Sequence, residues 1–244
     1  LMKSNFVLLS LLIGIIIGRE SHYVFDLEIS GNQHLEVSQL KNKIRLQPRG
    51  VFSKTEFNQK KLHLDEITLK NYYQTMGFID VTVSSRYEVF QETDVNVKIN
   101  INEGKQYFIG EINYDGIKLF KDNEIDKIID LREDDIYNPA KLRRHLKQLK
   151  YEYLSQGKLD VSIVDEIVLD ENNVRIKLLV SEGSTYSIRS INIKGLVDVD
   201  KKYITRELLF SKEMIYNIKI LNKTREQIFE SGLFSSVEIQ PQII

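Results

Sequence analysis

The 244-residue sequence contains no cysteine, and this absence removes several functional classes at once. Disulfide bonds, thiolate nucleophiles and cysteine-ligated metals are all excluded. The sequence also lacks an excess of either charge, because 34 Lys and Arg residues face 35 Asp and Glu residues and leave a formal charge of -1. Without a basic surplus, no long-range field favours nucleic acid or an anionic membrane surface. Partners must therefore be recognised by local surfaces.

Histidine, a common metal ligand and acid–base catalyst, is also sparse. The four histidines are scattered and never pair at a metal-ligand spacing: His22, His34, His63 and His145. The charge run at residues 132–135 mixes Arg, Glu and Asp ahead of a predicted helix, which is typical of a solvated loop rather than a catalytic carboxylate pair. We expect no cofactor, no metal site and no enzymatic activity.

The apolar run near the N-terminus is short. Residues 6–17 are apolar apart from one serine and one glycine, whereas a membrane-spanning helix needs about 20 apolar residues. Lys3 precedes the run, so residues 1–20 are predicted to be a secretory signal peptide. An uncleaved anchor is the alternative, because Gly18 is the best small residue available for cleavage. Leu1 before Met2 suggests a fragment or a true start further upstream.

A repeated pattern with a period near 80 residues organises the rest of the chain. Glu103-Gly104 is followed by Tyr107, and the same marks recur 79 residues later at Glu182-Gly183 and Tyr186. These marks predict three units, at residues 23–103, 104–182 and 183–244.

Each unit opens with alternating apolar residues that run into a glycine turn. In the first unit Phe25, Leu27 and Ile29 predict a half-buried strand that ends at Gly31. The corresponding glycines are Gly116 and Gly195, and a short amphipathic helical pattern follows each of the three.

A second helix begins at an aromatic residue followed by a capping residue. The pairs are Phe52-Ser53, Tyr137-Asn138 and Tyr216-Asn217. Ser53 with Glu56 fits a capping box, and Pro139 occupies a first helical position where its missing N–H costs nothing. These helices are predicted to end at glycines suited to a left-handed cap, namely Gly77, Gly157 and Gly232.

Two alternating segments follow the second helix in the first two units, and they predict two strands with one solvated face. The third unit shows only the first of them, around Val237 and Ile239. The predicted fold is therefore α+β, a tandem array of two-layer β-α-α-β-β modules with the third incomplete.

This order of elements resembles the POTRA repeat of BamA-like outer-membrane protein assembly factors. The motifs that carry the resemblance are residues 29–32, residues 73–81 and residues 231–237. The resemblance implies a cell outer membrane protein with this region in the periplasm and a C-terminal membrane barrel that is not present in this chain. It also implies unfolded outer-membrane proteins, assembly-complex lipoproteins and periplasmic chaperones as partners.

The resemblance further implies a binding mechanism without catalysis. An edge strand of a three-stranded sheet can accept an extended peptide as an additional strand, and in the family the strand after the second helix is the usual exposed edge. It maps to residues 79–86 and 159–164, and the candidate partner-binding residues are Ile79, Val81, Thr82, Val83, Ser84, Leu159, Val161, Ser162 and Ile163. The hypothesis concerns their backbone, since polar side chains such as Thr82 and Ser84 taken singly are typical of solvated strands.

Other readings of the repeats stay open. A TamA-like factor, the POTRA region of a two-partner-secretion transporter and a barrel-less POTRA adaptor all fit the same pattern. A cell-division protein of the FtsQ type fits less well, because it pairs one repeat with a full transmembrane helix. A KH-like RNA module also packs helices on three strands, but the sequence has neither its G-x-x-G clamp nor a basic excess.

Overall fold

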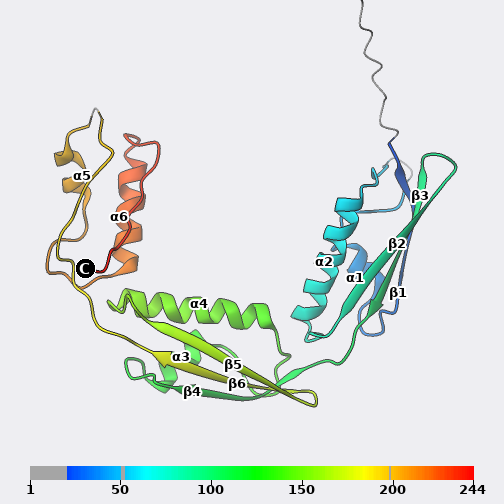
Figure 1. The fold of residues 1–244 in the computed structure, drawn as a ribbon, viewed down its shortest axis with the longest axis horizontal. Coiled ribbons are helices and arrows are strands. Elements are labelled where there is room, and N and C mark those ends of the chain that lie inside the picture. Colours follow the sequence, from blue (N-terminus) through cyan, green and yellow to red (C-terminus); the bar gives the residue numbers. More distant parts are fainter. Residues whose placement is uncertain (1–20, 51–52, 198) are drawn as a thin grey trace, which may run out of the picture. The chain divides into compact units, whose positions relative to one another are not determined.

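The computed structural model describes residues 21–50, 53–197 and 199–244, so the predicted signal peptide at residues 1–20 lies outside the described residues. Two compact units make up the chain (Figure 1). Of the described residues, the first unit contains those up to 70 together with 82–102, and the second contains those of 71–81 and of 103–244. No helix among the described residues is long and apolar enough to cross a membrane.

The first unit is built on a three-stranded sheet with its last strand in the middle. The strands are β1 (Tyr23–Ser30), β2 (Thr82–Phe90) and β3 (Asp94–Asn102), in the order β1-β3-β2. The β3 strand runs parallel to β1 and antiparallel to β2. Its alternate residues form the floor of the core and are almost fully buried: Val95, Val97, Ile99 and Ile101.

Two helices complete this module, α1 (Val37–Lys41) and α2 (Gln59–Thr75). A buried carboxylate ties the chain after α1 to α2, because Asp65 accepts hydrogen bonds from the backbone N–H groups of Arg45 and Leu46, both at 2.9 Å. Two charge-assisted bonds satisfy the carboxylate where water cannot reach it.

The start of α2 differs from the prediction. The helix begins at Gln59, so Ser53 and Glu56 do not form a capping box. The backbone of residues 55–57 is bonded to the opening strand instead, with Val24 N–H donating to Thr55 O at 3.0 Å. Asn58 supplies the cap by accepting from Lys60 N at 2.8 Å, as Asn138 and Asn217 do in the later helices.

The alternation predicted for the first strand is also interrupted. A β-bulge falls between Val24 and Asp26, so Val24 is buried and Phe25 points outward with 49% of its surface exposed. The extra residue of a bulge shifts every side chain before it to the opposite face. The ring of Phe25 packs edge-on against Phe90 instead of entering the core.

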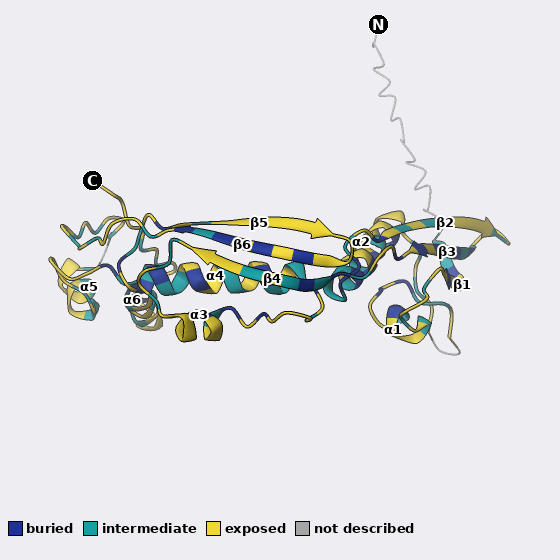
Figure 2. Cartoon of the chain, turned by 90° about the horizontal axis from the view of Figure 1, so that it is seen from below, coloured by how far each residue is buried: buried dark blue, intermediate teal, exposed yellow. Residues whose placement is uncertain are grey.

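The second unit contains a sheet of the same topology. Its strands are β4 (Phe108–Asp115), β5 (Ser162–Asp170) and β6 (Asn173–Ser181), in the order β4-β6-β5. The helices α3 (Asp122–Ile128) and α4 (Pro139–Ser155) accompany it. Figure 2 shows the buried residues alternating along β6 while β5 is exposed along almost its whole length.

The described residues from 184 to 244 hold the helices α5 (Lys201–Glu207) and α6 (Ile218–Glu230), but no strand longer than an isolated bridge. The opening strand predicted to run into Gly195 and the strand predicted around Val237 and Ile239 are therefore absent there. The last strand is central in both sheets and bonds to each outer strand. This part of the sequence contains no counterpart of β3 or β6, so the two outer segments have no central strand to pair with.

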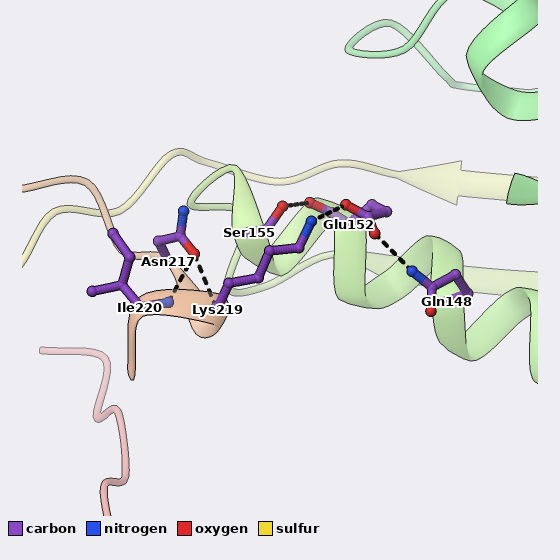
Figure 3. Close-up of polar contacts among 6 residues, drawn as sticks. All are labelled: Gln148, Glu152, Ser155, Asn217, Lys219 and Ile220. Carbon is purple, nitrogen blue, oxygen red and sulfur yellow. Dashed lines mark hydrogen bonds and ion pairs between the residues drawn. The ribbon is translucent and has the colours of Figure 1, made fainter. Parts of the chain in front are cut away.

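The end of α4 is joined to the start of α6 inside the second unit (Figure 3). Lys219 Nζ lies 2.7 Å from Glu152 Oε2, and Gln148 Nε2 donates to the other carboxylate oxygen at 2.7 Å. The Asn217 side chain caps α6 by accepting from the backbone of Lys219 and Ile220. The helix start that orients Lys219 is thus set by the residue two positions before it.

The glycine turns at the ends of β1 and β4 are sterically required. Gly116 has φ +82°, and a Cβ there would lie 2.0 Å from the carbonyl oxygen of Val180. Gly195 has a similar φ of +80° with nothing within 4 Å.

We therefore expect Gly116→Ala to destabilise the second unit by clearly more than the roughly 1–2 kcal/mol that a left-handed alanine costs. Gly195→Ala is the matched control. An alanine there would also be held at a positive φ, but its Cβ would meet no other atom within 4 Å. Urea unfolding followed by circular dichroism measures both. Equal losses for the two variants would show that the Val180 carbonyl does not constrain this turn.

Candidate binding edges of the two sheets

Each sheet has two outer strands, and these two strands differ in the backbone hydrogen bonding along their outer edges. The opening strands are partly covered, because the segment before the second helix bonds to their first residues. In the second sheet Ile109 N–H donates to Asp135 O at 2.8 Å, and Asp134 N–H donates to Ile109 O at 2.7 Å. In the described chain, β2 and β5 have no backbone partner other than β3 and β6. Their outer N–H and C=O groups form open edges.

The structure places five of the nine predicted edge residues on these strands: Thr82, Val83, Ser84, Ser162 and Ile163. The other four precede the strands: Ile79, Val81, Leu159 and Val161. They lie outside the strands because each helix exits through a hydrogen-bonded turn. Val81 N–H donates to Phe78 O and Val161 N–H to Lys158 O, both at 3.4 Å, and both valines are buried.

The predicted edge segments also end before the observed strands do. The strands run on to Phe90 and Asp170, four and six residues beyond the predicted limits of 86 and 164. The missed half contains the exposed apolar residues Tyr87, Val89, Ile167, Val168 and Leu169. Their β-branched and aromatic composition up to the Glu171 turn was the available signal.

The six motif glycines all have positive φ: Gly31, Gly77, Gly116, Gly157, Gly195 and Gly232.

No group of three or more His, Asp and Glu side chains in the described chain is arranged to hold a metal ion.

The notable polar pairs join tyrosines to carboxylates. The Tyr73 hydroxyl donates to Glu103 at 2.9 Å, and Tyr153 donates to Glu182 at 3.0 Å. Burial and the neighbouring carboxylate raise the pKa of both tyrosines. These residues link the end of a second helix to the segment after the central strand.

Glu182 is held by three donors. Its Oε1 also accepts from the backbone N–H groups of Lys118 and Leu119, both at 2.7 Å. Burial alone would raise the pKa of Glu182, but these bonds and the Tyr153 hydroxyl outweigh it, so the pKa lies below its usual value. The ionised carboxylate is the form that the fold stabilises.

A pH dependence follows. The folded state binds fewer protons to Glu182 than the unfolded state does, so the free energy of unfolding should fall as pH drops below about 4.3, the pKa of an unperturbed glutamate. Glu182→Gln should lower stability at neutral pH and flatten this decline. Urea unfolding between neutral and acidic pH measures both. The same acid slope in the variant and the parent chain would contradict the assignment.

Comparison with known proteins identifies the repeats. The profile of the family described as "Surface antigen variable number repeat", POTRA, matches residues 22–104, 107–183 and 186–243. The chain belongs to the POTRA family. The repeated β-α-α-β-β topology is therefore the POTRA fold, and the three matched segments together cover nearly all the described residues.

Individual relatives agree with this assignment. The chain is 26% identical over 243 residues to outer membrane protein assembly factor BamA of Buchnera aphidicola, covering 92% of this chain and 39% of that protein. It is 24% identical over 219 residues to a putative outer membrane protein assembly factor of Treponema pallidum, covering 86% of this chain and 26% of that protein. This chain thus spans well under half the length of these relatives.

A solved structure shares the fold. The crystal structure of Haemophilus influenzae BamA POTRA3-5 superposes with a TM-score of 0.65 and covers 91% of each chain at 20% identity.

Proposed function

We propose that this chain is the periplasmic POTRA array of an outer-membrane protein assembly factor, and that it binds extended segments of other polypeptides along the open edges of β2 and β5. The family membership and the BamA relatives support the setting. The observation that carries the binding mode is the absence of any second backbone partner for β2 and β5 in the described chain.

An added strand would satisfy backbone groups that now face solvent. Main-chain hydrogen bonds supply affinity with little dependence on sequence, which suits a factor that handles many unfolded outer-membrane proteins. Lipoproteins of the assembly complex and periplasmic chaperones are the other partners that we propose for this array. No reaction chemistry is needed for this role.

Proline substitutions test the edge directly. Successive residues of an antiparallel strand point their N–H groups alternately toward and away from the paired strand. In β5, one of Val164→Pro and Asp165→Pro should therefore break a bond to β6 and cost about 1–3 kcal/mol of stability. The other should leave the fold intact and weaken binding of a short fluorescein-labelled peptide of alternating valine and threonine, measured by anisotropy.

Val164→Thr and Asp165→Glu keep both N–H groups and serve as controls. Full peptide binding by both proline variants, with the fold retained in circular dichroism, would show that the edge of β5 is not a binding site.

A further inference from the structure

An aromatic pair lies on the solvent face of the first sheet, at the end where β2 turns into β3. The β-bulge between Val24 and Asp26 makes Phe25 the extra residue of β1, and 49% of its surface is exposed. Its ring meets Phe90, the last residue of β2, edge to face with centroids 5.1 Å apart. Bulges commonly re-aim a side chain in this way. The bulge therefore presents an aromatic surface outside the core.

A row of hydrogen-bond acceptors crosses the same face beside the aromatic pair. Asn96 lies in the central strand, opposite Asp26 on one side and Glu88 on the other. Both carboxylates are exposed, and neither makes a side-chain hydrogen bond or ion pair within the described part of the chain. Asn96 Oδ1 is buried beside a shallow hollow and accepts no hydrogen bond from the described residues. A donor placed over this row would satisfy an acceptor that is costly to leave unpaired.

The nearest cations are directed to a different carboxylate. Lys98 Nζ lies 2.9 Å from Glu28 Oε2, in the next row of the sheet. The hydrogen bond and the charge of Lys98, with a smaller contribution from Arg86, lower the pKa of Glu28. Among the described residues, no cation lies within ion-pair distance of Asp26 or Glu88. The row that they flank is therefore left with negative charge alone.

The second sheet has the same bulge but no aromatic pair there. Its register shifts between Ile109 and Glu111, so Gly110 is the extra residue and takes the place of Phe25. Asp170 ends β5, where Phe90 ends β2. The aromatic pair is thus a property of the first sheet and is not required by the fold that both sheets share.

The central residue of the row differs as well. Arg175 of β6 holds the position of Asn96, opposite Glu111 of β4, and its guanidinium lies 3.6 Å from Asp170 Oδ2. The second sheet therefore supplies a cation to its carboxylates from its own central strand. The first sheet has the carboxylates and an aromatic pair, but an amide in place of the cation. This difference indicates that the cation of the first sheet comes from another molecule.

Arginine fits this surface best. Its planar guanidinium stacks on aromatic rings and can donate to two acceptors at once, whereas the lysine ammonium is a strongly hydrated point charge. The negative row repels the phosphates of an anionic lipid surface or a nucleic acid. A polypeptide with an exposed arginine has the complementary charge and shape.

We propose that the solvent face of the first sheet, at Phe25, Asp26, Glu88 and Phe90, is a docking surface for an exposed arginine of another polypeptide. The guanidinium stacks on the aromatic pair and donates to the acceptor row. This surface is separate from the open edges of β2 and β5, and its occupant need not be an extended strand.

A peptide that cannot add as a strand tests the surface separately from the edges. The probe is the blocked peptide Gly-Pro-Arg-Pro-Gly, because prolines lack the N–H groups that strand pairing needs. The same peptide with citrulline, which is neutral and nearly isosteric with arginine, is its control. Each is titrated into the isotope-labelled full chain to a concentration on the order of 10 mM, since exposed charge contacts are individually weak. Backbone amide shifts in NMR spectra report the site and the affinity.

We expect the arginine peptide to shift amides of residues 24–28, 86–90 and 94–98. Citrulline in the peptide, or Asp26→Asn combined with Glu88→Gln in the chain, should each lower the affinity by about fivefold, the upper scale of an exposed ion pair. Glu111→Gln is the matched control in the second sheet and should leave the affinity unchanged.

Asn96→Arg copies the residue of the second sheet and provides a second test. Its guanidinium should occupy the row from within the chain and abolish peptide binding, while the circular dichroism spectrum stays that of the parent. Phe25→Leu should weaken the arginine peptide and leave the citrulline peptide unchanged, because only the charged group gains from the aromatic face.

Equal affinity for the arginine and citrulline peptides would overturn the proposal, and so would parental binding by Asn96→Arg. Shifts confined to residues outside the first sheet would also contradict it. Self-association of the parent chain in sedimentation that Asp26→Asn with Glu88→Gln abolishes would assign the surface to a second copy and overturn the proposed occupant. None of these outcomes bears on strand addition at the edges, which this peptide does not report.

Discussion

The central strand of each sheet is the constraint on which the rest of the architecture depends. Because the last strand of the repeat lies in the middle, it bonds in parallel to the first strand and antiparallel to the second. Its buried row, such as Val174, Ile176 and Leu178, forms the floor of the core. The same order leaves the second strand at the edge. The described residues from 184 onward, which have no counterpart of this strand, form helices and an isolated bridge but no sheet.

The sequence predicts the central strands and the helix spacing well, because one buried face imposes a regular period on both. It fails where a local hydrogen bond competes with that period. The bulge at Phe25 reverses the alternation by one residue and leaves no mark in the pattern. Ser53 and Glu56 have the right types for a helix cap, yet the chain there bonds to the opening strand. Phe57-Asn58 was the true counterpart of Tyr137-Asn138.

The candidate edges were only half predictable. Their place in the repeat follows from topology, so Thr82 and Ser162 were correctly placed on the strands. Whether an edge is covered depends on side chains from elsewhere in the sequence, such as Phe57 and Glu66 beside β2. Alternation along a single strand carries no information about such contacts. Two strands with similar patterns therefore make different side-chain contacts.

Amide hydrogen exchange on the full chain with the valine–threonine peptide in excess tests the central claim most directly. Strand addition predicts that alternate amides of β2 or β5, those whose N–H groups point away from β3 or β6, become protected. Protection confined to the helices, with β2 and β5 unchanged, would contradict the account.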